Sequence, residues 1–191
     1  MSKVALCDVR GPLADLMDKL SGKNGHQWLE ALKHFLRRRM FVDKVTLGDA
    51  VNLTRAHRFV PRGDETTREM LRQINCCPQD WELPLVVVMP EEIGLAGQMP
   101  DYKTVCVAAE QHGYQLCPNE VGPQLRVQYP LCEGDLFVAS EPMATSDKGL
   151  CIFLVGMLYG VRTRHLSYVN VEYEGSEGFL SSTKFVFQKA Q

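Results

Sequence analysis

The sequence predicts an α+β fold in which N-terminal helices precede an antiparallel sheet or a small barrel. Two observations predict it. Apolar residues recur at helical spacing through the first part of the chain, and five strand-like segments separated by turn residues follow position 124. A length of 191 residues leaves little room for two independent hydrophobic cores. We therefore expect a single domain over residues 1–191, helical from about 12 to 75 and strand-rich from about 83 to 189.

The first predicted helices lie before residue 40. Leucines and methionines at helical spacing predict one helix within about residues 13–20. A longer helix follows at His26–Arg39, where Asn24 supplies an N-cap and an apolar stripe includes Trp28 and Phe35. We expect this stripe to be structural, with its side chains packed in a core.

Two later segments are rich in helix-forming residues. Glu65–Ile74 begins after Asp64, which suits an N-cap, and Tyr102–Gln111 ends before Gly113, which suits a C-terminal cap. The segment Asn52–Asp64 mixes basic and apolar residues and is interrupted by a proline and a glycine. It is therefore predicted to be a loop or connector.

Strand predictions begin with Phe41–Leu47, where β-branched and aromatic residues alternate in part before a turn. Leu83–Met89 is a continuous apolar run with three valines, which indicates a central strand. Turn residues then separate five further segments, which we expect to form the antiparallel sheet or barrel. These segments are Gln124–Tyr129, Leu136–Ser140, Cys151–Met157, Ser167–Tyr173 and Lys184–Gln188.

Composition and charge exclude several classes of protein. The net charge of -2 and the pI near 6.2 give no overall attraction to polyanions, so any such site must be local. The apolar runs are shorter than the roughly 20 residues of a membrane-spanning helix, and Asp8 and Arg10 interrupt any signal-peptide core. We expect a soluble cytoplasmic protein without a membrane partner, whose seven cysteines are reduced thiols.

Sequence motifs for cofactor, metal or hydrolase chemistry are missing. The chain has no C-x-x-C pair, no glycine-rich phosphate loop of known spacing, and neither H-E-x-x-H nor G-x-S-x-G. His165 stands beside Arg162 and Arg164 in a predicted turn, where a solvated role fits better than metal ligation. We therefore expect no cofactor and no metal.

One stretch of the chain carries a resemblance. Gln115–Tyr129 reads QLCPNEVGPQLRVQY, with Val86–Leu95 ahead of it and Ser140–Met143 after it. Together with the Trp-Leu-x-Ala helix at Trp28–Arg37, this stretch resembles a group of uncharacterised hypothetical proteins from uncultivated bacteria. The resemblance covers the first long helix and residues 83–143. It implies a common domain, and it transfers no activity, cofactor or site residue to this chain.

Basic residues gather in two stretches that are close in sequence. Arginine binds phosphate oxygens in a bidentate manner, so the two stretches predict a polyanion-binding surface if the fold brings them to one face. The alternative is a solvated helix end whose cations complement the helix dipole. The residues are Lys33, Arg37, Arg38 and Arg39 in the first stretch and Arg55, Arg58 and Arg62 in the second.

The loop Cys117–Pro123 contains the candidate catalytic residues. Glu120 lies between two prolines, and loops that are fixed on a scaffold often carry functional groups. Cys117 is a candidate nucleophile, with His112 as its base and Glu120 as a further polar group. The alternative is structural, because Pro118 can start a helical turn whose amides Glu120 caps.

The sequence is consistent with two functions. The first is a non-enzymatic binding or accessory module whose partner is a protein or a nucleic acid, favoured by the lack of a catalytic motif. The second is a small cysteine-dependent enzyme that uses residues 112–120. The environment of Cys117 separates them, since a thiol buried among apolar side chains is not available as a nucleophile.

Overall fold

The chain divides into two compact units, Met1–Phe41 and Val42–Gln191. The computed structural model describes residue 15 and residues 17–28, 42–129, 134–158, 163–172 and 178–190. Among these residues, no helix is both long enough and apolar enough to cross a membrane.

The first unit contains helical segments at residues 17–21 and 25–28. The ammonium group of Lys19 lies 2.6 Å from a carboxylate oxygen of Asp15 and 4.8 Å from the centroid of the Trp28 ring. Trp28 is 40% exposed, so it does not pack in a core as expected. Phe35 and the remainder of the predicted helix lie outside the described residues.

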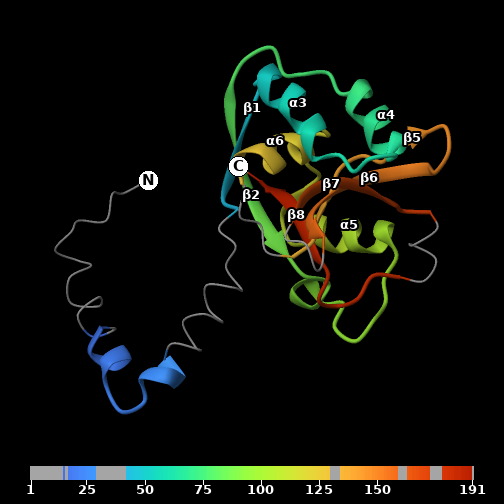
Figure 1. Ribbon diagram of the computed structural model, residues 1–191. Coiled ribbons are helices and arrows are strands. Elements are labelled where there is room, and N and C mark those ends of the chain that lie inside the picture. Colours follow the sequence, from blue (N-terminus) through green and yellow to red (C-terminus); the bar gives the residue numbers. More distant parts are fainter. Residues whose placement is uncertain are drawn as a thin grey trace. The chain divides into compact units, whose positions relative to one another are not determined.

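The second unit is built on an open, mixed sheet (Figure 1). Six strands lie in the order β1-β2-β8-β4-β6-β5, while β3 also pairs with β8 and β7 with β6. The C-terminal strand β8 inserts between β2 and β4 and runs parallel to β4, whereas the other pairs are antiparallel. The bounds are β1 (Lys44–Leu47), β2 (Trp81–Val88), β3 (Tyr114–Gln115), β4 (Leu136–Val138), β5 (Met143–Thr145), β6 (Gly149–Leu158), β7 (Thr163–Asn170) and β8 (Lys184–Lys189).

The predicted combination of helices with a sheet is confirmed. The prediction of a purely antiparallel sheet or a small barrel is wrong, because the β4–β8 pair is parallel and the sheet stays open. The predicted order of helices first and strands second is also wrong. Among the described elements, the strands β1 and β2 precede the helices α5 (Tyr102–Gln111) and α6 (Val121–Gln128).

Helices cover both faces of the sheet (Figure 1). Three α-helices and the short 3-10 helix η1 lie on one face, and α5 and the 3-10 helix η2 lie on the other. On the first face are α3 (Ala50–Ala56), η1 (His57–Phe59), α4 (Glu65–Gln73) and α6 (Val121–Gln128). On the second are η2 (Pro90–Ile93) and α5 (Tyr102–Gln111).

The segment Asn52–Asp64, predicted to be a loop, consists largely of α3 and η1. The carboxylate of Asp49 starts α3 by accepting hydrogen bonds from the amides of Val51 and Asn52, at 2.9 and 3.0 Å. The loop prediction failed because buried residues are spaced widely among exposed polar ones in this segment, so its helical periodicity is weak. Its contact with the rest of the fold depends on a few buried residues such as Ala56.

The segment Gln124–Tyr129, predicted to be a strand, forms most of α6. Pro123 lies in the first turn of this helix, where its missing N–H costs no hydrogen bond. Gly122 packs on β6 so closely that an added Cβ would lie 2.6 Å from the Cβ of Phe153. Packing of the helix on the sheet therefore overrides the local preference for a strand.

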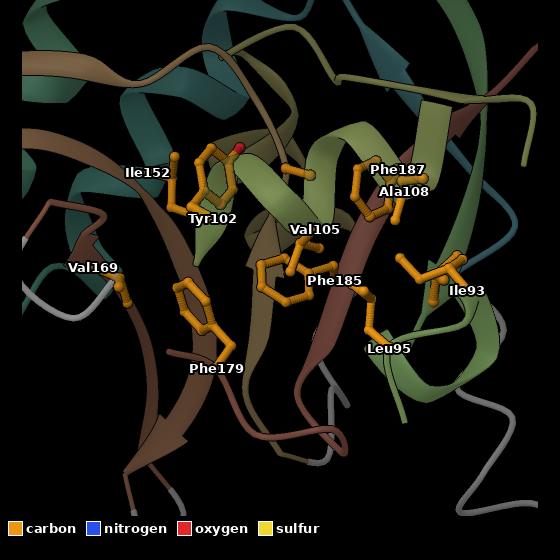
Figure 2. Packing of buried hydrophobic residues seen from close by; sticks show 13 residues of the cluster. Ile93, Leu95, Tyr102, Val105, Ala108, Ile152, Val169, Phe179, Phe185 and Phe187 are labelled. Carbon is orange, nitrogen blue, oxygen red and sulfur yellow. The ribbon is translucent and has the colours of Figure 1, made fainter. Parts of the chain in front are cut away.

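Helix α5 is fixed by an aromatic core, shown in Figure 2. Val105 of α5 is fully buried in the same cluster as Phe185 and Phe187 of β8. The Tyr102 hydroxyl donates a hydrogen bond to the carbonyl of Ser140 at 2.7 Å and accepts one from its amide at 2.9 Å. The predicted bounds of this helix are confirmed, as is Gly113 after its end with a φ of 80°.

Candidate functional site

The second basic stretch, which we call the arginine segment, spans residues Arg55–Arg62. Arg55 lies in the last turn of α3, Arg58 in η1 and Arg62 in the turn that follows, and all three side chains are exposed. In the part of the chain that the structure describes, none of these three arginines forms an ion pair. The cations that do form ion pairs there are Lys19, Lys44, Arg68, Arg72 and Lys148.

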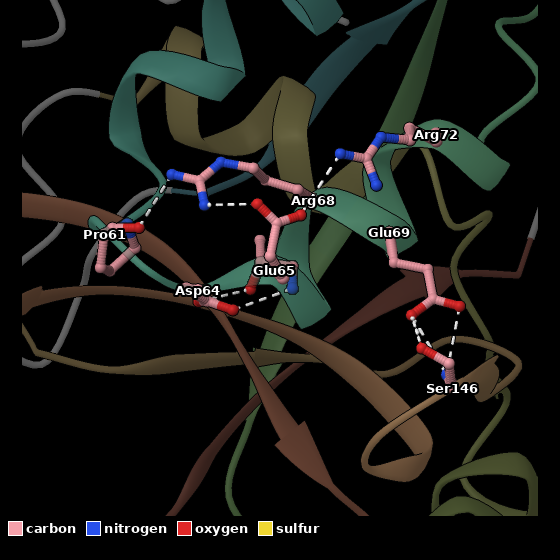
Figure 3. Close-up of polar contacts among 8 residues, drawn as sticks. Pro61, Asp64, Glu65, Arg68, Glu69, Arg72 and Ser146 are labelled. Carbon is pink, nitrogen blue, oxygen red and sulfur yellow. Dashed lines mark hydrogen bonds and ion pairs between the residues drawn. The ribbon is translucent and has the colours of Figure 1, made fainter.

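Contacts with the fold anchor the backbone of the arginine segment. Ala56 is fully buried, and the ring of Phe59 lies under the guanidinium of Arg126, with 5.6 Å between its centroid and Cζ. The carbonyl of Pro61 accepts a hydrogen bond from Nη2 of Arg68 at 3.2 Å (Figure 3). The three arginines therefore project from a backbone that is held in place at several points.

The first basic stretch, Lys33, Arg37, Arg38 and Arg39, lies outside the described residues. Arg55, Arg58 and Arg62 thus make up the described part of the candidate polyanion-binding surface.

Cys117, the candidate nucleophile, is buried beside the sheet. Its side chain is 3% exposed, and its thiol donates a hydrogen bond to the carbonyl of Val186 at 3.5 Å. Burial raises the pKa of this thiol far above its usual range, because a thiolate would lose its hydration there. A cysteine in this state is inert as a nucleophile at neutral pH.

The two other candidate catalytic residues point to different parts of the fold. His112 follows the last turn of α5, and its Nδ1 lies 2.8 Å from the carbonyl oxygen of Ala108. Glu120 precedes α6, and its carboxylate accepts hydrogen bonds from the amides of Gly48 and Cys77. The contacts of Cys117, His112 and Glu120 thus involve three separate sets of residues.

The carboxylate of Glu120 joins three segments that are distant in sequence. It is 3% exposed, and its Oε1 accepts hydrogen bonds from the amide of Gly48 at 2.7 Å and from Nε2 of Gln124 at 2.8 Å. Its Oε2 accepts one from the amide of Cys77 at 2.9 Å, while the thiol of Cys76 lies 3.6 Å from Oε1. The predicted alternative, a cap for its own helix, is wrong, because no such side-chain bond forms.

Two glutamines of α6 extend this network towards β1. Nε2 of Gln124 also donates to the carbonyl of Asp49 at 3.0 Å. The side-chain amide of Gln128 accepts from the amide of Thr46 at 2.9 Å and donates to its carbonyl at 2.7 Å. Glu120, Gln124 and Gln128 therefore hold β1 and the start of α3 against α6.

A second polar cluster is buried beneath α6. Arg126 is fully buried, and its Nη1 donates to the carbonyl of Gly156 at 3.1 Å. His165 is paired with Gly156 across β6 and β7, and a Cβ at Gly156 would overlap Oδ1 of Asp135 and lie 3.0 Å from Cε1 of His165. Arg126, Asp135 and His165 therefore meet around Gly156, where an added Cβ would force the side chain of Asp135 to move.

His165 was predicted to lie solvated in a turn, and this prediction is wrong. The residue is 7% exposed and lies in β7, which begins at Thr163 and not at Ser167 as predicted. Burial lowers the pKa of His165, the nearby charges of Asp135 and Asp64 counteract this in part, and Arg126 lowers it further. The imidazole is thus favoured in its neutral form.

A cavity of about 450 Å³ lies at the N-terminal end of α4. Carboxylates line it, and each already interacts with neighbouring residues. Glu69 accepts a hydrogen bond from Oγ of Ser146 at 2.8 Å, and Glu65 pairs with Arg68 and Arg72 at 3.2 and 3.3 Å (Figure 3). In the described ranges, no group of three or more His, Cys, Asp or Glu residues is arranged to hold a metal ion.

Comparison of the chain with protein-family models, with curated proteins and with solved structures gives no match.

Two polar groupings escaped prediction from the sequence. The adjacent cysteines Cys76 and Cys77 are visible there as a pair, and their position before Pro78 was the available signal. Asp135 and His165 lie close together because β6 pairs with β7. The sequence contains no local signal for the register of this pairing.

Proposed function

We propose that this chain is a non-enzymatic binding module that contacts the phosphate backbone of a nucleic acid through the arginine segment. One observation supports the proposal above the others. Arg55, Arg58 and Arg62 are exposed, lie close together in sequence, and have no ion pair in the described part of the chain. Within the described residues, no carboxylate lies within ion-pair distance of their guanidinium groups.

The arginines of the neighbouring helix α4 are placed differently. Arg68 and Arg72 share the carboxylate of Glu65, so a phosphate would have to compete with an existing ion pair. The arginine segment presents the same donors without this competition, and arginine binds phosphate through two parallel hydrogen bonds. Because such contacts reach the backbone of the nucleic acid, the binding is independent of base sequence.

The alternative of a cysteine-dependent enzyme has lost its support. The thiol of Cys117 is buried, its pKa is raised, and neither His112 nor Glu120 is its hydrogen-bond partner in the described structure. We therefore assign residues 112–120 a structural role within the binding module.

The proposal is tested by the salt dependence of binding. Fluorescence anisotropy with a labelled single-stranded oligonucleotide should show an affinity that falls steeply as salt is added. Each phosphate contact on a single strand contributes about 0.7 to the slope of log K against log salt, so Arg55→Gln with Arg58→Gln should reduce it by about 1.4. The loss should be the same for oligonucleotides of different sequence.

A matched control removes two cations elsewhere. Lys103 on α5 and Lys189 on β8 are exposed, and α5 covers the face of the sheet opposite α3 (Figure 1). Lys103→Gln with Lys189→Gln makes the same change in net charge and should keep the slope of the unmodified protein. Equal slopes for both double variants, or no binding to single-stranded or duplex nucleic acid at low salt, would contradict the proposal.

A further inference from the structure

Two cysteines that are adjacent in sequence lie beside the carboxylate of Glu120. Cys76 and Cys77 are half-buried in the connection between α4 and β2, whereas Cys117 and Cys151 are buried. Within the described residues all five of the cysteines are free thiols. We propose that Cys76 and Cys77 form a redox-active pair that small-molecule disulfides oxidise reversibly to a disulfide between these neighbours.

The geometry favours a bond within the pair. Glu120 holds both residues at one point, because its Oε1 lies 3.6 Å from the Cys76 thiol and its Oε2 accepts a hydrogen bond from the Cys77 amide at 2.9 Å. The side chain of Cys77 is close enough to that of Cys76 to interact with it electrostatically. Once one cysteine of the pair carries glutathione as a mixed disulfide, the thiol of the other cysteine is held beside it. Attack by this neighbouring thiol is therefore faster than attack by a thiol from solution.

The bond should also be easy to reduce. Neighbouring Cα atoms are about 3.8 Å apart across a trans peptide, while disulfides usually join Cα atoms about 4.4 to 6.8 Å apart. A disulfide formed at this shorter separation is strained, and strained disulfides have the more oxidising potentials of labile or regulatory bonds.

Cys77 should be the sulfur that attacks first. Burial and the charge of Glu120, to whose Oε1 the Cys76 thiol is hydrogen-bonded, raise the pKa of Cys76 and so deplete its thiolate. The thiolate is the nucleophile in disulfide exchange, so Cys76 reacts more slowly with an incoming disulfide.

Oxidised glutathione serves as the small-molecule disulfide. Cys77 gives its proton to solvent and attacks one glutathione sulfur, which forms a mixed disulfide and releases glutathione thiolate. Cys76 then loses its proton and attacks the sulfur of Cys77, which releases the second glutathione. The protein loses two electrons and two protons, and the glutathione disulfide gains them as two thiols.

Oxidation should weaken the contacts of Glu120. The thiol donor of Cys76 disappears, and closure of the ring rotates the peptide group that presents the Cys77 amide to Oε2. An ordinary disulfide stabilises by closing a long loop, but this one closes no loop of useful length. The oxidised protein should therefore melt at a lower temperature than the reduced protein.

Trypsin offers a clean assay on the full chain. The tryptic peptide Gln73–Lys103 contains Cys76 and Cys77 and no other cysteine. After incubation of the reduced protein with oxidised glutathione and alkylation of the remaining thiols, mass spectrometry should find this peptide two hydrogen atoms lighter and not alkylated. Dithiothreitol should restore the reduced mass.

Two serine variants test the order of the steps. Cys76→Ser should stop at a glutathione adduct on Cys77, and Cys77→Ser should form an adduct on Cys76 several-fold more slowly. A peptide that stays reduced in the unmodified protein, or that carries glutathione on both cysteines, would overturn the proposal. An equal or higher melting temperature after oxidation would overturn the link to Glu120. The peptide mass and the melting temperature are measured on the unmodified protein, so they test the proposal even if a serine variant fails to fold.

Discussion

Glu120 is a buried carboxylate that is stabilised by backbone dipoles. In the described part of the chain no lysine or arginine pairs with it, and its donors are the amides of Gly48 and Cys77 and the side chain of Gln124. Its position before the first turn of α6 adds the favourable field of a helix N-terminus. The charge is therefore compensated by hydrogen bonds from three segments of the chain.

Replacing this carboxylate should be costly. Glu120→Ala leaves the donors of Gly48, Cys77 and Gln124 without their acceptor, and each unsatisfied buried donor costs about 1 to 3 kcal/mol. Because part of this is regained by relaxation, we expect a loss on the order of 3 kcal/mol in the free energy of unfolding, measured by urea denaturation. Glu110→Ala, at an exposed position on α5, should change it by less than about 0.5 kcal/mol. Equal stability of the two variants would refute this role for Glu120.

The roles of single residues were only partly predictable from the sequence. The prolines around Glu120 marked its loop as rigid, and a structural alternative to catalysis was among the predictions. Its partners Gly48 and Cys77 lie far from it in the chain, and local patterns carry no information about such contacts. For the same reason the burial of Cys117 against β8 could not be foreseen.

Among the elements, α5 and α6 show opposite outcomes of prediction. The helix α5 carries its own signals, with Asp101 as N-cap, an apolar side and Gly113 after its end. In α6 the low helix propensities of Gly122 and a valine oppose a helix, and contact with β6 decides the conformation. Elements whose caps and periodicity agree were therefore predictable, and those held by tertiary packing were not.

The close contact between α6 and β6 makes a prediction at the level of elements. A Cβ added at Gly122 would meet Cβ, Cγ and Cδ2 of Phe153 at 2.6 to 2.8 Å, and both residues are buried. Gly122→Ala should therefore destabilise the protein by about 1 to 3 kcal/mol through overpacking, despite the better helix propensity of alanine.

A double variant separates the clash from other effects. In Gly122→Ala with Phe153→Leu, the smaller leucine side chain gives room for the new methyl group. The double variant should therefore lose less stability than the sum of the losses of the two single variants. The measurement is thermal or urea unfolding of all four proteins. Strict additivity would show that Gly122 is needed for some other reason.

The whole second unit should respond to pH through His165. Burial lowers the pKa of this histidine in the folded protein, and Arg126 adds to the effect, while Asp135 and Asp64 oppose it. As the pH falls through the unfolded value near 6.5, the unfolded chain takes up a proton that the folded protein resists. The neutral His165 thus contributes stability above this pH. This contribution decreases as the pH falls further, until the pH reaches the pKa of His165 in the folded protein.

We therefore expect the free energy of unfolding to decrease between about pH 7.5 and about pH 5.5. The check is urea denaturation at both pH values for the unmodified protein and for His165→Gln. The variant keeps a polar side chain of similar length but cannot titrate, so the difference between the two pH values should shrink. An unchanged difference would place the responsible group elsewhere.

The contact between Gln128 and Thr46 has a consequence for how copies of this chain behave in solution. β1 ends the sheet on one side, and an exposed strand at such a position can recruit a strand from another molecule. Gln128 occupies the amide and carbonyl of Thr46, the groups that an incoming strand would use. A single side chain of α6 thus blocks the addition of a further strand at Thr46.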